Sequence, residues 1–292
     1  TLSRSIAQTM SVLRVSDVQL DKLALSTALN KNANGGSFAS LSYLGEPLRI
    51  QTPLLQAPCG IGRFQKKGKQ DEYEYNLLCS FHELQNATST GTKQQQFFEW
   101  LLALNTRVKE QILAHYEEQS SSAGAVQRSY YQAFRPQDKT TTVQDAIRIN
   151  FRSFVKEEHE SEKGTTYPPS LTTKMHVAQD DAKQEVFKTK LWGSRGQPYE
   201  LPASGAGAAA GGSAECVPAN YQHIIPRKSL VACILKFRGI WVIDRKISLA
   251  VDLEELKIHP RPAATSCGFQ DDEDDIAAGA AAAGATADRK ST

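Results

Sequence analysis

The sequence predicts a mainly β protein, an antiparallel barrel or sandwich with one long helix. Short segments with strand patterns alternate with turn-rich segments along most of the chain, and one segment has the period of an amphipathic helix. The chain has 292 residues, of which 40% are hydrophobic and 23% charged, so it can form a packed core in one large domain or two small ones. Frequent turns between short strands favour an antiparallel architecture.

The expected strands are short and are separated by turn residues. The turn at residues 30–36 is rich in Asn and Gly, and Pro53 ends a strand because proline cannot donate to a ladder. The strands are expected at residues 23–29, 37–44, 48–52, 73–81, 147–155, 171–177, 185–192, 230–237, 240–243 and 247–258. Between them, residues 60–69 are expected to form a flexible basic loop.

One long helix is expected at residues 93–118. Its apolar residues recur at steps of three and four, namely Phe97, Trp100, Leu101, Leu104, Val108, Ile112, Leu113 and Tyr116. The serine-rich residues 120–124 end it, and residues 126–134 are expected to be a second, short helical or irregular segment. The long helix is expected either to cover one end of a barrel or to form a partner surface.

Two segments are expected to lack a packed structure. Residues 202–220 consist of Ala, Gly, Ser and Pro with few other residues, and we interpret them as a disordered insertion between strands. The tail 263–292 is also expected to be disordered, so the expected domain is 1–262.

The last 26 residues carry six acids and two bases, which leaves a net charge of +6 on residues 1–266. A basic body with an acidic appendage suggests a polyanionic ligand.

Enzyme and metal signatures are not found. The chain has no phosphate-binding loop, no nucleophile elbow, no zinc-protease motif and no dinucleotide fingerprint. The five cysteines (Cys59, Cys79, Cys216, Cys233 and Cys267) form no CxxC pair and are expected to be reduced structural thiols. The six histidines are dispersed, and His115 is expected to be solvated on the helix. We therefore expect no catalytic residue, no metal and no cofactor.

The sequence also shows no recognisable targeting or membrane-spanning segment. No apolar stretch is long enough to span a membrane, and the first residues lack a secretory pattern. We expect an intracellular protein that is not secreted.

Basic residues interleaved with aromatic residues point to nucleic acid. Single strands are bound by a cationic groove that follows the phosphates and by aromatic faces on which bases stack. The side chains expected to contact nucleic acid are Arg63, Lys66, Lys67, Lys69, Arg148, Arg152, Phe154, Lys188, Lys190, Trp192, Lys236, Arg238, Trp241, Arg245 and Lys246. Residues 60–69 would form an arm on the phosphates, and Phe154, Trp192 or Trp241 would stack on bases. The alternative for Phe154 and Trp241 is a place in the core.

The acidic tail has two candidate functions. Its acids Asp271, Asp272, Glu273, Asp274 and Asp275 are expected to compete with DNA for the cationic groove or to dock replication partners. The alternative is a solubilising linker.

Several short motifs resemble the single-stranded DNA-binding proteins of nucleocytoplasmic large DNA viruses. They are Gly35-Gly36, Leu-Arg-Ile-Gln-Thr-Pro at 48–53, Ala-Pro-Cys-Gly-Ile at 57–61, Tyr-Pro-Pro at 167–169, Leu-Val-Ala-Cys-Ile-Leu at 230–235, Gly-Ile-Trp at 239–241 and the strand at 246–253. They occur in the family's order over about residues 20–260. Cys59 stands where the family usually has Phe.

The resemblance implies an OB-like antiparallel barrel with sequence-independent single-stranded DNA binding and no catalysis. It also implies a distant similarity to phage replicative single-stranded DNA-binding proteins, which carry an acidic C-terminal tail. The expected role is protection of DNA during replication, recombination or repair, in a host nucleus or a cytoplasmic viral factory. A homodimer or higher oligomer is compatible with it. The alternative is a non-enzymatic scaffold, or a virion or replication-factory component, that uses the same barrel for protein contacts.

Overall fold

The fold is that of a computed structural model, which describes residues 11–33, 35–66, 68, 72–85, 91–121, 128–136, 140–162, 164–179, 185–199 and 224–259. Internal contacts divide the chain into two units, Thr1–Pro260 and Arg261–Thr292, and every described residue belongs to the first. The expected insertion at 202–220 and the expected tail at 263–292 lie outside the described residues. None of the described helices is long and apolar enough to cross a membrane.

One sheet of 13 strands dominates the first unit. Its strands are β1 (Leu23–Leu25), β2 (Asn30–Lys31), β3 (Ser37–Tyr43), β4 (Leu48–Gln51), β5 (Leu55–Ala57), β6 (Ile61–Gln65), β7 (Tyr73–Ser80), β8 (Phe151–Arg152), β9 (Val155–Lys156), β12 (Ser170–Met175), β15 (Lys190–Trp192), β16 (Ser229–Ile243) and β17 (Lys246–His259). Two small ribbons pair β10 (His159–Glu160) with β11 (Thr166–Tyr167), and β13 (Val177–Gln179) with β14 (Glu185–Phe187).

Among the elements that the structure describes in full, three α-helices and three 3-10 turns accompany the sheet. The helices are α1 (Lys93–Ser121), α2 (Ser129–Phe134) and α3 (Val143–Asn150), and the turns are η1 (Val15–Asp17), η2 (Leu20–Lys22) and η3 (His82–Gln85). The described structure is therefore mainly β with one long helix, which confirms that part of the prediction.

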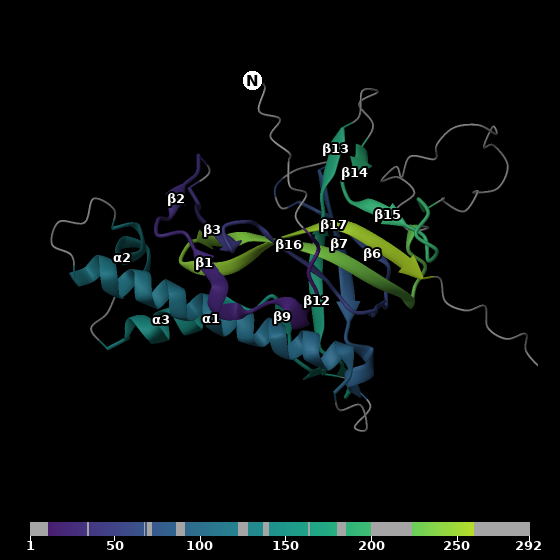
Figure 1. The fold of residues 1–292 in the computed structure, drawn as a ribbon, viewed down its shortest axis with the longest axis horizontal. Coiled ribbons are helices and arrows are strands. Elements are labelled where there is room, and N and C mark those ends of the chain that lie inside the picture. The colour runs from purple at the N-terminus through teal and green to yellow at the C-terminus, as the bar shows by residue number, and fades with distance from the viewer. Residues whose placement is uncertain are drawn as a thin grey trace, which may run out of the picture. The chain divides into compact units, whose positions relative to one another are not determined.

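The hairpin β16–β17 is the central element of the sheet. Its two strands are much longer than the short strands that the sequence suggested (Figure 1). Asp244 and Arg245 form its turn with φ of 48° and 65°, the double left-handed conformation that suits a two-residue hairpin loop. Register shifts at Ile234/Leu235 and Phe237/Gly239 mark bulges, which bend and twist a strand. β16 can therefore pair along its length with β3, β4 and β5 in turn.

Five strands close a circuit of hydrogen-bonded pairs. β16 pairs with β5, β5 with β7, β7 with β12, β12 with β17, and β17 returns to β16. The pairs are antiparallel except for β12 and β17, which run parallel and share the partners Lys174 and Asp252. The side chains inside this circuit are apolar and buried, including Leu55, Leu77, Leu171, Leu235 and Leu256.

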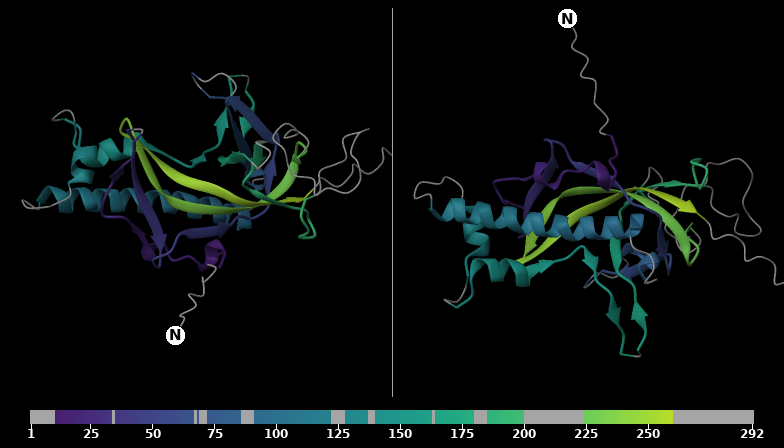
Figure 2. Two further views of the ribbon diagram at one scale, coloured as in Figure 1. Left: turned by 90° about the horizontal axis from the view of Figure 1, so that it is seen from above. Right: turned by 60° about the horizontal axis from the view of Figure 1, so that its bottom comes forward.

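Helix α1 runs beneath the long hairpin (Figures 1 and 2). Its predicted apolar stripe is confirmed, because Phe97, Leu104, Val108 and Ile112 are fully buried. Trp100 touches Phe237 of β16 edge to face, with 5.9 Å between the ring centroids. The helix thus covers the apolar side of the sheet, and burial of this stripe stabilises both elements.

The polar side of α1 forms hydrogen bonds with the edge of the sheet at β1. Gln111, His115 and Gln119, spaced by four residues, hydrogen-bond the backbone carbonyls of Leu23, Leu25 and Thr27. The repeat of the helix thus matches alternate carbonyls of an extended segment. The prediction of a solvated His115 is wrong, since its ring also packs against Tyr130 with centroids 5.0 Å apart.

Three other expectations about elements need correction. Residues 147–155 are not one strand, because Thr142 caps a helix by accepting a hydrogen bond from the Asp145 amide, and α3 extends to Asn150. Residues 60–69 contain the strand β6, which pairs with β7. Residues 185–192 form two strands, with β14 antiparallel to β13 and β15 parallel to β17.

Candidate nucleic-acid interface

The outer side of the sheet carries a concentrated set of charges. We call it the charged face and define it by the outward side chains Arg49 (β4), Lys174 (β12), Lys236 and Arg238 (β16), and Asp252, Glu254 and Glu255 (β17). The alternation of each strand places these polar residues outside while their apolar neighbours fill the core. The consecutive residues Glu254 and Glu255 both face outward because the register shift at Ile234/Leu235 interrupts the alternation there. Residues from segments far apart in sequence therefore meet on one surface.

Acids of β17 hold three of the four cations of the charged face in place, whereas Lys174 pairs with Glu74 of β7 at 2.9 Å. Glu254 pairs with Arg49 at 2.6 Å and with Lys236 at 3.5 Å. Asp252 pairs with Arg238 at 2.8 Å and lies 3.2 Å from the ring of His176. The cations are thus preorganised by carboxylates, which have the same charge sign and similar hydrogen-bonding oxygens as a phosphate.

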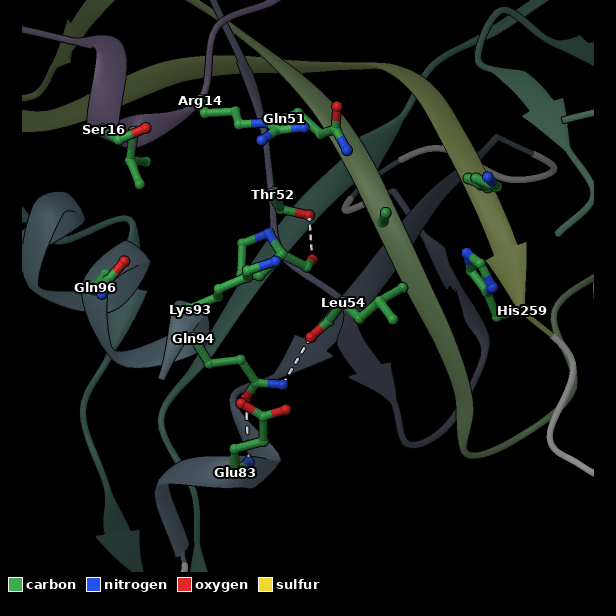
Figure 3. A pocket seen from close by; sticks show the side chains of 14 residues that line it. Arg14, Ser16, Gln51, Thr52, Leu54, Glu83, Lys93, Gln94, Gln96 and His259 are labelled. Carbon is green, nitrogen blue, oxygen red and sulfur yellow. Dashed lines mark hydrogen bonds between the residues drawn. The ribbon is translucent and has the colours of Figure 1, made fainter. Parts of the chain in front are cut away.

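A hollow of about 510 Å³ lies at one end of this face. Figure 3 shows Arg14, Gln51 of β4, Lys93 of α1 and His259 of β17 around it. Lys257 lines it as well, and Glu83 is an acid at its margin. Gln94 is buried in its wall, where the side-chain amide donates to the Leu54 carbonyl at 2.7 Å and accepts from the Glu83 amide at 3.1 Å. Cations therefore line this hollow from three separate segments.

A second hollow of about 340 Å³ adjoins the first. Both are lined by Gln51, Ala232 and Lys257, so together they form one groove, called here the sheet groove. Trp192 lies at its far end, where the indole Nε1 donates to Oε2 of Glu255 at 2.9 Å. β15 holds this residue beside Lys257 in a parallel ladder, and the indole remains partly exposed. An aromatic side chain is thereby fixed beside a cation.

A third hollow, of about 340 Å³, is lined by residues of β7, β12 and β13, beside the parallel contact of Lys174 with Asp252. It is lined by Lys66, Tyr73, Lys174 and His176, among others. The Arg63 guanidinium lies 3.5 Å from the centroid of the Tyr73 ring, which is a close cation–π contact. Lys66 is paired with Glu72 at 3.0 Å. Aromatic and basic groups therefore accompany the charged face at this end too.

The expected binding residues do not all gather there. Lys190 pairs with Glu255 at 3.7 Å near Trp192, and Lys188 is exposed beside it. Arg245 and Lys246 are exposed at the turn of the long hairpin. Lys67 and Lys69 lie outside the described residues.

Arg148, Arg152 and Phe154 fall within the strand expected at 147–155, but the structure does not place them on one strand. Arg148 belongs to α3 and pairs with Asp145 at 3.2 Å, whereas Arg152 is exposed on β8. Phe154 packs edge to face on Phe237 with centroids 6.0 Å apart, next to the core.

Trp241 also has an aromatic neighbour, since its ring lies 4.9 Å from that of Phe38 on β3. Of the three aromatic residues expected to stack on bases, only Trp192 lines one of the three hollows.

Sequence reasoning missed five residues of the sheet groove: Arg14, Gln51, Lys93, Lys257 and His259. Lys257 was recognisable as a polar position in an expected strand, and Lys93 as the first residue of the expected helix. Their convergence depends on strand register and on the placement of the N-terminal segment, and neither has a local signal.

Burial contributes to shifts in the pKa of His259 and of Cys79. Burial, together with the neighbouring charge of Lys257, lowers the pKa of His259, so its ring is neutral at pH 7. A hydrogen bond with the Cys233 thiol, followed by burial, raises the pKa of Cys79.

The described cysteines, Cys59, Cys79 and Cys233, are free thiols. Among the residues that the structure describes, no three His, Cys, Asp or Glu side chains group as metal ligands.

The sequence matches no protein-family model and no curated protein. Among solved structures, the chain is similar to gp2.5, a single-stranded DNA-binding protein encoded by bacteriophage T7, with 13% identity, 80% of this chain and 94% of that chain covered, and a TM-score of 0.35. It is also similar to a single-stranded DNA-binding protein from bacteriophage Enc34 in complex with ssDNA, with 8% identity, 82% and 98% covered, and a TM-score of 0.31. At these scores neither likeness establishes the function of this chain, and the resemblance to the large-virus family stays a prediction.

Proposed function

We propose that the protein binds single-stranded DNA across the charged face, between the hollow at Tyr73 and the sheet groove at Trp192. The observation that carries the proposal is that cations continue along this surface and an aromatic side chain stands at each end. Backbone phosphates need spaced cations, and unstacked bases need aromatic faces. Contacts to phosphates and to ring faces do not in themselves depend on the sequence.

The strand circuit supports an OB-like barrel. That fold is a five-stranded Greek-key barrel that binds oligonucleotides on the face of its second and third strands and on the neighbouring loops. In chain order, the second and third strands of the circuit are β7 and β12. The hollow with Lys66, Tyr73 and Lys174 lies on them, so the expected ligand face of such a barrel coincides with one end of the charged face.

Protection of single-stranded DNA in replication, recombination or repair follows from this activity as the proposed role. The acidic tail is proposed to compete with DNA, because its acids are of the same charge sign as phosphate. Removal of residues 267–292 is then expected to tighten DNA binding at low salt, and unchanged affinity would exclude a competing tail.

The proposal is tested with the variant Arg14→Gln/Lys93→Gln/Lys257→Gln and a fluorescent dT oligomer. Removal of three groove cations is expected to weaken binding at least tenfold at low salt and to lower the slope of log K against log salt by about 2, at roughly 0.7 per phosphate contact. The matched control is Lys22→Gln/Lys31→Gln/Lys156→Gln, which removes three exposed cations that line none of the hollows. Equal losses in both variants would show that general charge, and not the groove, determines binding.

A further inference from the structure

The hollow at Trp192 combines groups that suit a nucleobase and not only a phosphate. It has a volume of about 340 Å³, enough for one nucleotide, and its walls include Gln51, Trp192, Glu255 and Lys257. The indole offers a ring face, Lys257 offers a cation for an adjoining phosphate, and Glu255 contributes an anionic group. A carboxylate repels a backbone phosphate, so Glu255 suits contact with the base of a nucleotide and not with its phosphate.

Glu255 has acceptor capacity to spare. One oxygen, Oε2, accepts the indole N–H of Trp192 at 2.9 Å, and the other, Oε1, lies 3.7 Å from the Lys190 Nζ. A carboxylate has about four acceptor positions, so both oxygens can accept further hydrogen bonds. The side chain is about a quarter exposed, at 23%, and it lines the hollow. Its orientation is fixed by two partners, and a ligand therefore meets an acceptor that is already oriented.

We propose that the Trp192–Glu255 hollow is a nucleobase subsite that prefers bases with an exocyclic amino group. A base stacked on the indole turns its polar edge to the surrounding groups, where a carboxylate accepts the amino hydrogens of cytosine, adenine or guanine. Uracil and thymine place carbonyl oxygens at the same edge, and these are repelled by the carboxylate. The inference rests on the proposed binding of single-stranded DNA and adds a base preference to it.

Cytosine and uracil provide a matched pair of ligands, because the two bases differ mainly in an amino group and a carbonyl at one ring position. Fluorescence anisotropy with dC and dU oligomers of equal length, at pH 8 to keep cytosine neutral, measures the preference. The wild-type chain is expected to bind dC about fivefold more tightly than dU, which is less than a fully buried hydrogen bond to a charged group would give. Glu255→Gln is expected to bring the ratio to about one, since an amide donates to uracil as well as it accepts from cytosine.

Glu254→Gln is the control for charge, since it removes the same charge one position away without lining the hollow. It is expected to change both affinities together and to leave the ratio unchanged. Equal affinities for dC and dU in the wild-type chain would overturn the base preference while leaving single-strand binding intact, and so would a ratio that survives in Glu255→Gln. Failure of both oligomers to bind at low salt would instead overturn the proposed function.

A second measurement needs no change at Glu255. The fluorescence of the folded wild-type chain is expected to be quenched more by millimolar dCMP than by dUMP, and the difference is expected to disappear in Trp192→Phe. Trp100 is 8% exposed and Trp241 packs on Phe38, so the residue at the hollow dominates the signal that the nucleotide changes. Equal quenching by the two nucleotides would contradict the subsite.

Discussion

Arg49 and Glu254 stand on two strands that both pair with β16, and their side chains meet across it with 2.6 Å between Nε and Oε2. Lys236 lies between them on β16 and comes within 3.5 Å of the same carboxylate. One acid therefore neutralises two cations at the centre of the proposed DNA path. A phosphate that binds there must take the place of this carboxylate.

Glu254→Gln is therefore expected to tighten binding to a dT oligomer about threefold to tenfold at low salt. The slope of log K against log salt is expected to become steeper by up to about 1.4, because two freed cations each gain a phosphate at roughly 0.7 per contact. Loss of the ion pair is expected to lower stability by about 1 kcal/mol. Glu110→Gln, which removes a partner of Arg107 on α1, serves as control. An unchanged slope in Glu254→Gln would place the phosphates elsewhere.

Trp192 and Trp241 are expected to respond in opposite ways. Trp192→Ala removes a base platform and is expected to weaken single-strand binding by about 1–3 kcal/mol, with little change in the melting temperature. Trp241→Ala removes the partner of Phe38 and is expected to lower stability by about 2 kcal/mol, less than a fully buried aromatic, with little effect on binding. Anisotropy and thermal melts of the two variants separate the roles, and a binding loss confined to Trp241→Ala would reverse the assignment.

Gly239 is essential to the junction of β16 with β3. A Cβ at this position would lie 1.9 Å from the Ala39 carbonyl oxygen and 2.9 Å from the Phe38 ring. Gly239→Ala is therefore expected to destabilise the fold by about 3 kcal/mol or more, since both neighbours belong to a paired strand. Gly45→Ala is a suitable comparison, because its φ of +89° is strained but the space is open, and about 1 kcal/mol is expected there. Similar urea midpoints for the two variants would contradict the close approach.

His259 is expected to couple DNA binding to pH. Its pKa is lowered by burial and by Lys257, and the groups that face the same hollow are Arg14, Lys93 and Glu83. A phosphate in the hollow favours the protonated ring, so binding takes up a proton and affinity rises as pH falls below about 6.5. In the unfolded chain the His259 ring is protonated at a higher pH than in the folded chain. The stability of the fold therefore decreases as the pH is lowered over this range, whereas the affinity for DNA increases.

Affinity measured from about pH 7.5 to 5.5 checks this coupling against the ordinary pKa of histidine. The part of the increase in affinity that is due to the His259 ring is expected to disappear in His259→Gln. It is expected to remain in His159→Gln, because the His159 ring stacks on Tyr167 in the β10–β11 ribbon. A profile that His259→Gln leaves unchanged would place the phosphates away from this hollow.

Local patterns in the sequence were sufficient for part of the fold. The apolar stripe from Phe97 to Ile112 predicted α1, and the strands around Ile50 and Leu235 follow from alternation and flanking turn residues. The apolar residues spaced through 147–155 suggested a strand, but one of them, Ile149, is 72% exposed on a capped helix. A short run of spaced apolar residues fits a helix as well as a strand.

The site was predictable only in part, for a physical reason. Arg49 and Glu254 are 205 residues apart, and only the register of β4 and β17 on β16 brings them together. Basic residues indicated the class of ligand, but no local signal showed that acids of β17 pair with most of the face cations. For the same reason the aromatic residues could not be sorted from the sequence into core, as for Phe154, and groove, as for Trp192.

The most direct test of the account is the anisotropy of a labelled dT oligomer and of a duplex of equal length, titrated with the full chain over a salt series. We predict that the single strand binds at least tenfold more tightly than the duplex and that its affinity falls steeply with salt, at roughly 0.7 per phosphate contact. Equal affinity for the two ligands, or single-strand binding without salt dependence, would contradict it.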